Sequence, residues 1–284
     1  MIHTPRHLAL VVFDLAGTTV DHGCFAPIAA FLGAFAEMGI EVTPAAARGP
    51  MGLKKIDHVR ELTRLPEVAK QWQAAQGREF TEADVHDIYA RFVPRQLAVV
   101  EEHGELIPGL LDTLAYLRER GIKTGTTTGY FGEAAEIAYR AAARQGFEPD
   151  SHVNPEHVPA GRPAPWMIYR NMEATGVYPA AAVLKIGDTV PDVLEGRNAG
   201  VWTVGVTRTS SEVGLTAEAF AALEPSEQLA QLTAAETKLL DAGAHAVVES
   251  VADLPALIPR IEALLAQGEQ PTGDAHALST AVVG

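Results

Sequence analysis

The chain has 284 residues and a mass of 30.2 kDa, a length that suits two domains or one domain with a large insertion. Apolar residues make up 47% of it and charged residues 20%, which excludes general disorder and a fibrous repeat. Its 22 basic and 36 acidic side chains give a net charge of −14, so we expect neither a nucleic acid nor a membrane surface as a partner. An anionic substrate would need local positive charge from a few Lys or Arg side chains, a metal ion or helix N-termini.

The single cysteine and the N-terminal sequence bear on the cellular compartment. Cys24 cannot form an intrachain disulfide, which favours a reducing environment. The apolar run near the N-terminus is interrupted by Asp14 and suits a buried strand better than a signal peptide. No stretch of the sequence approaches the ~18 apolar residues of a membrane-spanning helix. We therefore expect a cytoplasmic protein.

A helix-rich segment follows the first predicted strand. That strand is expected over residues 8–13, which are apolar on both faces, as is typical of a central parallel strand. No strand pattern occurs between residues 22 and 98, and we interpret residues 22–100 as an inserted α-helical cap domain. Its helices are expected over 25–38, from Pro44, over 55–65, and from a capping box at Thr81 to Phe92.

Strands and helices alternate along the rest of the chain. Such alternation predicts an α/β fold, a Rossmann-like parallel sheet with helices on both faces. The core would comprise residues 1–21 and 101–267, with a polar excursion over 208–242, and residues 268–284 would form a loose C-terminal tail. The strands are expected over 122–127, 182–186, 201–206 and 246–249, and the helices over 109–120, 133–145, 165–175, 190–199, 215–223 and 226–242.

Polar side chains follow three of the predicted strands. Asp14 comes after the first strand, Thr128 after the second, and Asp188 and Asp192 after the third. If these strands are neighbours, the side chains converge on one crevice, because ligands of such sheets bind beyond the carboxyl ends of the strands. Carboxylates with a hydroxyl suit a hard cation such as Mg²⁺ and a phosphoryl group. Helix N-capping explains Asp192 equally well, but explains Asp14 and Asp188 together less well.

Four motifs in the right order resemble those of the haloacid dehalogenase superfamily. Most phosphatases of that superfamily have a second aspartate two residues after the nucleophile, and this position is Ala16 here. An alanine cannot act as an acid or a base, so a leaving group would have to be handled differently. The motifs are Asp14-Leu-Ala-Gly-Thr-Thr-Val-Asp21 with the nucleophile Asp14, then Thr128, Arg162 in Gly161-Arg-Pro-Ala-Pro165, and Gly187-Asp-Thr-Val-Pro-Asp192.

The predicted cap carries a lysine in a distinctive setting. Met51 lies four residues before Lys55 and His58 three after it, so the three can share one helix face if helicity extends that far. Such neighbours and a metal can lower the pKa of a lysine, which is otherwise ~10.4 and leaves about one molecule per thousand neutral near pH 7.5. The alternative is an ordinary solvated helix lysine, with Met51 filling the core or a turn.

These features together resemble the phosphonatase family within that superfamily, over about Leu8 to Leu264. The resemblance implies hydrolysis of the P–C bond of phosphonoacetaldehyde to acetaldehyde and phosphate. Direct cleavage would expel a strongly basic carbanion, whereas an iminium formed by a lysine can absorb the electrons. The matching segments are Asp14 to Pro27, Pro50-Met-Gly-Leu-Lys-Lys-Ile-Asp-His58, Thr128-Gly-Tyr130, Val158-Pro-Ala-Gly-Arg-Pro163 and Glu195 to Gly205.

The resemblance also assigns roles to individual residues. Lys55 would form the Schiff base and Asp14 an aspartyl phosphate, with His58 in proton transfer or positioning. The family pattern further implies a homodimer that contacts through the cap, to which Phe31, Leu32 and Phe35 would contribute unless they serve ordinary packing. The other implied roles are phosphoryl binding by Thr128 and Arg162, Mg²⁺ binding by Asp14, Asp188 and the backbone carbonyl of Ala16 with Asp192 in support, and pocket shaping by Met51, Gly52, Cys24 and Tyr130.

Other functions remain compatible with the sequence. A phosphatase of the same superfamily is one, although Ala16 argues against it. A hydrolase of a different carbonyl phosphonate is another, and a non-catalytic sensor of a phosphorylated ligand is a third. In the phosphonatase reading the cap closes over the core, with hinges near Asp21 to Gly23 and Glu101 to Gly104.

Overall fold

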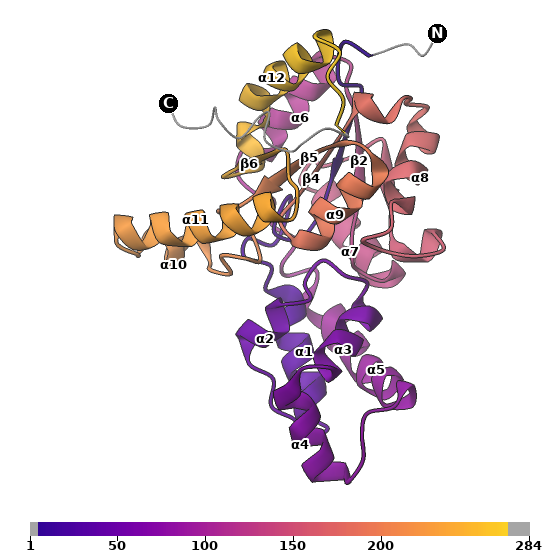
Figure 1. Ribbon diagram of the computed structural model, residues 1–284, viewed down its shortest axis with the longest axis vertical. Helices are drawn as coiled ribbons and strands as arrows, with labels where there is room; N and C mark the ends of the chain where they lie inside the picture. The colour runs from indigo at the N-terminus through magenta and orange to yellow at the C-terminus, as the bar shows by residue number, and fades with distance from the viewer. Residues whose placement is uncertain (1–4, 272–284) are drawn as a thin grey trace.

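A parallel β-sheet forms the centre of the molecule (Figure 1). The computed structural model describes residues 5–271. The sheet has six strands in the order β3-β2-β1-β4-β5-β6, and every neighbouring pair is parallel. This arrangement confirms the predicted α/β class. The strands are β1 Leu10–Phe13, β2 Lys123–Thr127, β3 Ser151–Val153, β4 Val183–Gly187, β5 Trp202–Val206 and β6 Ala246–Val248.

Helices cover both faces of this sheet. Alternate side chains of β1 point to opposite faces, and because all of them are apolar, both faces must be buried against helices. Val11 and Phe13 belong to one apolar cluster with α6, α7 and α12. Leu10 and Val12 belong to another, with Ile168 of α8 and Ala199 of α9. The helices of these layers and of the excursion after β5 are α6 Leu110–Glu119, α7 Gly132–Ala143, α8 Trp166–Thr175, α9 Val190–Ala199, α10 Ala217–Ala221, α11 Pro225–Asp241 and α12 Leu254–Ala266.

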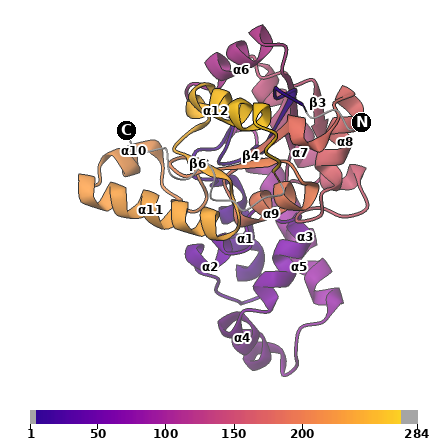
Figure 2. The same ribbon diagram turned by 45° about the horizontal axis from the view of Figure 1, so that its top comes forward.

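The predicted cap, residues 22–100, contains five α-helices and, as expected, no β-strand. It lies at one end of the molecule, below the sheet in Figure 1, and Figure 2 shows the same separation from another side. Phe31 of α1 stacks on Phe92 of α5 at 4.3 Å between ring centres. Phe31 and Phe35 are fully buried within the chain, so ordinary packing explains them. The helices are α1 Ala26–Ala36, α2 Pro44–Arg48, α3 Lys55–Thr63, α4 Pro66–Gln76 and α5 Glu82–Val99.

Several elements differ from the sequence-based expectation. The helix expected over 55–65 ends earlier, at Thr63, and a separate helix, α4, begins at Pro66, whose missing N–H is not needed in a first turn. The helix that begins after Thr81 continues past Phe92 to Val99 and contains Pro94. The three-residue edge strand β3 is too short to give a periodic pattern, and α12, which contains Pro259, was also missed.

Two further expectations concern the ends of the chain and the membrane. The predicted tail over 268–284 lies mostly outside the described residues, and no helix or strand occupies 268–271. Within residues 5–271, none of the helices combines the length and the apolar character that crossing a bilayer requires.

The packing of α8 on the sheet gives a first testable prediction. Ile168 is fully buried between α8 and the strands, so Ile168→Ala should lower the free energy of unfolding by about 2–5 kcal/mol. Chemical denaturation measures this change. Leu229→Ala is the control, because Leu229 is 66% exposed and its truncation should cost less than about 0.5 kcal/mol. Equal effects of the two variants would contradict the assigned packing.

Candidate active site

The candidate site lies beyond the carboxyl ends of three neighbouring strands. Strand β1 pairs with both β2 and β4, and Phe13 is level with Thr126 on one side and Ile186 on the other. The residues that follow these strands therefore face one another, as the sequence predicted. Together with residues of the predicted cap, they line a small pocket. It is lined by Asp14, Ala16, Cys24, Met51, Gly52, Lys55, Thr128, Gly129, Tyr130, Arg162, Asp188 and Thr189.

Both parts of the chain contribute to this pocket. Met51, Gly52 and Lys55 come from the cap, and the turn around Gly52 lies directly on the loop after β4. Gly52 has φ +91°, and a Cβ added to it would lie 2.2 Å from Thr189 Oγ1. Only glycine satisfies both the backbone conformation and this approach. The role of Gly52 is thus to let the cap come close to the core.

The amine of Lys55 is buried in an apolar setting. Its Nζ lies 3.8 Å from Met51 Sδ and 5.3 and 5.8 Å from the ring centres of Tyr130 and Phe31. Among the described residues, no carboxylate lies within the 4.0 Å of an ion pair with this amine. Burial therefore lowers the pKa of Lys55, although the more distant Cys24 and Asp14 oppose the shift.

Met51 and His58 both lie next to Lys55, but not on one helix face as expected. Helix α3 begins at Lys55, so Met51 reaches the amine from the preceding turn. His58 Nε2 lies 2.8 Å from the carbonyl oxygen of Ala47, and a carbonyl can only accept, so Nε2 carries the proton. Burial and the nearby Lys55 hold the pKa of His58 well below its usual value. The imidazole is therefore neutral, with Nδ1 as an acceptor that has no partner among the described residues.

Arg162 lies at the centre of a buried group of charges. Its Nη2 donates to Asp14 Oδ1 at 2.7 Å, and its Nη1 lies 3.0 Å from Asp192 Oδ1. Its Nε donates to Glu195 Oε2 at 3.0 Å. These carboxylates outweigh the effect of burial and raise the pKa of Arg162 above its ordinary value. Thr128, its expected partner in phosphoryl binding, accepts from the Tyr130 amide at 3.1 Å and lines the same pocket.

Three carboxylates form the candidate metal cluster. One oxygen from each of Asp14, Asp188 and Asp192 lies within 4.8 Å of the others, and all three side chains are buried. Burial, with its two acidic neighbours, holds the pKa of Asp188 well above the usual range, and burial also raises that of Asp14. Asp188 Oδ1 accepts no hydrogen bond from the described residues. An unsatisfied oxygen among repelling carboxylates fits a hard cation.

Asp192 has a supporting position in this cluster. Arg162 and Lys185 lower its pKa even though burial alone would raise it. Its Oδ2 accepts from Thr189 Oγ1 at 2.5 Å, and Thr189, not Asp192, is the N-cap residue of α9. The alternative explanation of Asp192 as an N-cap is therefore wrong. Asp188 likewise caps no helix, and its Oδ2 instead accepts from the Ser211 amide at 2.7 Å.

Sequence reasoning missed a second set of buried polar residues. Lys185 Nζ lies 2.8 Å from Asp192 Oδ1 and donates to Thr127 Oγ1 at 2.9 Å. Thr127 Oγ1 is also 3.1 Å from Glu195 Oε2, and burial raises the pKa of that glutamate. A lysine in an otherwise apolar central strand was the signal that could have revealed this network.

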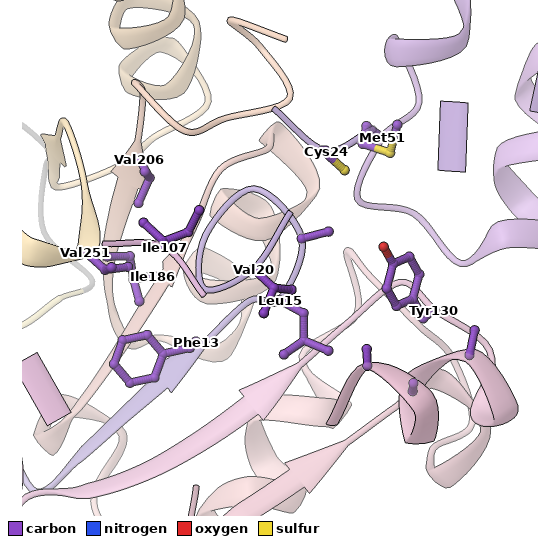
Figure 3. Packing of buried hydrophobic residues seen from close by; sticks show 14 of the residues in the cluster. Phe13, Leu15, Val20, Cys24, Met51, Ile107, Tyr130, Ile186, Val206 and Val251 are labelled. Atoms are coloured by element: carbon purple, nitrogen blue, oxygen red, sulfur yellow. The ribbon is translucent and has the colours of Figure 1, made fainter. Parts of the chain in front are cut away.

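Cys24 and Tyr130 close one side of the pocket. Figure 3 shows the Tyr130 hydroxyl directed toward the region where Cys24 and Met51 lie. Cys24 has φ +53°, and burial with Asp21 nearby holds its pKa well above the usual value, so it is a protonated thiol and a poor nucleophile. Burial likewise raises the pKa of Tyr130, which keeps its hydroxyl protonated.

Comparison with known proteins agrees with this arrangement. A family model described as haloacid dehalogenase-like hydrolase matches residues 8–200. A phosphonoacetaldehyde hydrolase of Syntrophobacter fumaroxidans is 48% identical, over 92% of this chain and 94% of its own. One from Bacillus cereus is 46% identical over 89% and 96%. The crystal structure of a phosphonoacetaldehyde hydrolase-like protein from Oleispira antarctica superposes with a TM-score of 0.92 at 39% identity, over 95% of this chain and 98% of that one.

The sheet, the strand-end aspartates and these matches define a haloacid dehalogenase-like hydrolase. Ten of the twelve predicted site residues line one pocket. Of the other two, His58 lies on the same helix as Lys55, and Asp192 lies 3.0 Å from Arg162. Within that class, the chain belongs to the phosphonoacetaldehyde hydrolase family.

The carboxylate cluster gives a second prediction. Mg²⁺ at about 100 times its dissociation constant should raise the melting temperature by roughly 5–10 °C, because the ion offsets the repulsion between Asp14 and Asp188. Asp188→Asn should abolish this increase, whereas the exposed control Asp112→Asn should retain it. Differential scanning calorimetry with and without Mg²⁺ measures the effect. An undiminished increase in Asp188→Asn would exclude this residue as a ligand.

Proposed function

We propose that this protein cleaves the P–C bond of phosphonoacetaldehyde to give acetaldehyde and phosphate. One observation carries the proposal: the buried amine of Lys55 and the carboxylate of Asp14 line the same pocket, while Ala16 occupies the position of the usual acid. The curated relatives named phosphonoacetaldehyde hydrolase support the same reaction.

The proposed reaction begins at the aldehyde. The neutral amine of Lys55 adds to the carbonyl carbon, and loss of water with uptake of one proton from solvent gives an iminium. Asp14 then attacks phosphorus, and the electron pair of the P–C bond moves into the iminium to form an enamine. One water hydrolyses the aspartyl phosphate to phosphate. After protonation of the enamine at carbon, a second water hydrolyses the imine and releases acetaldehyde from Lys55.

This route explains why Ala16 is tolerated. The alcohol of a phosphate ester would leave as an alkoxide, and its oxygen would need protonation by an acid two residues after Asp14. The enamine leaves without protonation of an oxygen, so no acid is required at Ala16. The same reasoning makes general phosphatase activity the weaker candidate function.

Burial prepares Lys55 for this role. The lowered pKa increases the fraction of neutral amine at a given pH, and only that form can attack the aldehyde. The neutral His58 is held by Ala47, and its Nδ1 is a hydrogen-bond acceptor without a partner among the described residues. We assign His58 to positioning of Lys55 or to the proton transfers that accompany imine formation.

The core residues would bind the phosphonate. Arg162 is fixed by carboxylates and presents its positive charge at the pocket, and Thr128 provides a hydroxyl. Asp14, Asp188 and the backbone carbonyl of Ala16 would hold Mg²⁺, with Asp192 in support. When bound, this ion supplies Lewis-acid stabilisation of the phosphoryl oxygens. Met51, Gly52, Cys24 and Tyr130 would shape the pocket around the aldehyde.

We further propose that residues 22–100 act as a mobile cap over a core of residues 1–21 and 101–267. One hinge would lie at the connection formed by Asp21, Gly23 and Cys24, which have φ +55°, +81° and +53°. The second hinge would lie near residues 101–104. The family resemblance also supports a homodimer that contacts through the cap.

Trapping of the imine provides the third prediction and tests the proposed function. Incubation with Mg²⁺ and phosphonoacetaldehyde followed by borohydride should leave a two-carbon adduct on Lys55, located by peptide mass mapping. The untreated enzyme should release equal amounts of acetaldehyde and phosphate. Lys55→Arg should lose both adduct and turnover, because a guanidinium is not nucleophilic at these pH values.

Lys54→Arg is the matched control for this experiment. Lys54 is the sequence neighbour of Lys55 but does not line the pocket, so this variant should retain the adduct and the activity. A folded wild-type protein with Mg²⁺ that gives neither adduct nor acetaldehyde would refute the proposal. Phosphate esters and other carbonyl phosphonates would then be screened for phosphate release.

The pH dependence of trapping gives a fourth prediction. Because burial lowers the pKa of Lys55 below 10.5, its amine becomes neutral at a lower pH than an exposed lysine. The initial rate of cyanoborohydride trapping on Lys55 should therefore rise with pH and level off before pH 10.5. Labelling of Lys54 in the same digest is the internal comparison. Coincident curves for the two lysines would contradict a lowered pKa at Lys55.

A further inference from the structure

The loop after β5 contacts several parts of the candidate site. Its Ser211 amide donates to Asp188 Oδ2 at 2.7 Å. Its Thr209 hydroxyl donates to the carbonyl of Gly17 at 2.6 Å, in the loop that follows Asp14. The carbonyl of Thr209 also accepts from the Gly23 amide at 2.8 Å, at the proposed hinge. The loop over residues 209–214 thus holds a candidate metal ligand and the start of the cap at once.

Arg48, the last residue of α2, binds this loop from the cap. Its Nη1 donates to the carbonyl of Gly23 at 2.7 Å and lies 3.5 Å from that of Ser211. Its Nη2 donates to the carbonyl of Gly214 at 3.3 Å. No carboxylate forms an ion pair with it in the part of the chain that the structure describes. Its charge is directed at backbone carbonyls of the hinge and the core loop.

The fit around Arg48 is close. A Cβ added to Gly214 would lie 2.7 Å from Arg48 Nε, and one added to Gly23 would lie 2.5 Å from the carbonyl oxygen of Leu215. The guanidinium also lies over the ring of Phe25, 4.9 Å from its centre. Both glycines have positive φ, so side chains there would be strained as well as crowded.

The short helix α2 also contacts the region around Lys55. The carbonyl of Ala47, one residue before Arg48, accepts from His58 Nε2, and His58 follows Lys55 on α3. Two consecutive residues therefore contact the imidazole beside the lysine and the loop that holds Asp188. Figures 1 and 2 both show α2 on the side of the cap nearest to α10 and α11, the two helices that follow that loop.

We propose that Arg48 is a positioning residue that fixes the register between the Lys55 side of the pocket and the Asp188 side. This inference rests on the proposed function, in which cleavage needs Lys55 and Asp14 to act on one substrate molecule. Arg48 touches neither reacting group. It acts by tying α2 to Gly23, Ser211 and Gly214, so that the aldehyde and phosphonate ends meet their partners together.

Three variants form the fifth prediction. Arg48→Met keeps the aliphatic stem and removes every donor, so the kcat for phosphate release should fall roughly 10- to 100-fold. Arg48→Lys restores one donor and should recover part of that loss. Arg64→Met is the matched control, because Arg64 is an exposed arginine of the same cap that pairs with Glu61, and the activity of this variant should equal that of wild type.

Hydrogen exchange separates positioning from general destabilisation. In Arg48→Met, the peptides that contain residues 207–216 and 18–25 should exchange faster, with and without Mg²⁺, while the sheet strands keep their protection. Unchanged kcat and exchange, or faster exchange spread evenly over the protein, would refute the proposal. If Arg48→Met does not fold, the same two readouts on Arg48→Lys decide between these outcomes.

Failure of the proposed function would look different. A wild-type protein that releases no phosphate from phosphonoacetaldehyde would refute P–C hydrolysis. The exchange contrast between Arg48→Met and Arg64→Met would still show whether Arg48 ties the cap to the 209–214 loop.

Discussion

The buried charge balance around Arg162 is the constraint on which the rest of the site depends. Four carboxylates, Asp14, Asp188, Asp192 and Glu195, lie around two cations, Arg162 and Lys185. If all are ionised, the sum is four negative minus two positive charges, a net −2 in a buried space. Such an imbalance is costly, and a divalent cation would cancel it. In the proposed function, this network would prepare the core for a metal and a phosphonate in a chain whose overall charge would repel an anion.

The cap supplies what this charged core lacks. Lys55 lies among Met51, Phe31 and Tyr130, and this apolar setting favours a neutral amine. In the proposed reaction, the core would present fixed charges to the phosphonate, and the cap would present the amine of Lys55 to the aldehyde. The close approach of Gly52 to Thr189 places the apolar surroundings of Lys55 next to the charged residues of the core. A single polar or single apolar pocket would not serve both ends of such a substrate.

Much of this fold and site could be predicted from sequence, for identifiable physical reasons. Alternating apolar strands and amphipathic helices fix a parallel sheet, and the sheet brings Asp14 and Asp188 to one edge. Lys185 and Glu195 could not be predicted, because their partners are set by strand order and helix packing. Arg48 gave no local signal, since its acceptors are backbone carbonyls far along the chain. The missed elements, β3, α4 and α12, are short or contain prolines that mask their pattern.

The origin of Lys55 and Asp14 from separate segments has a consequence for selectivity. A simple aldehyde would meet the lysine but offer no bond for Asp14 to cleave. A simple phosphate ester would reach Asp14, but its P–O bond would not break readily, because Ala16 cannot protonate the departing alkoxide. Only a molecule in which one carbon separates an aldehyde from a phosphonate can react first with Lys55 and then with Asp14. Substrate selectivity would then come from the requirement that both reactions occur on the same molecule. Abundant cellular aldehydes and phosphates would bind transiently without being consumed.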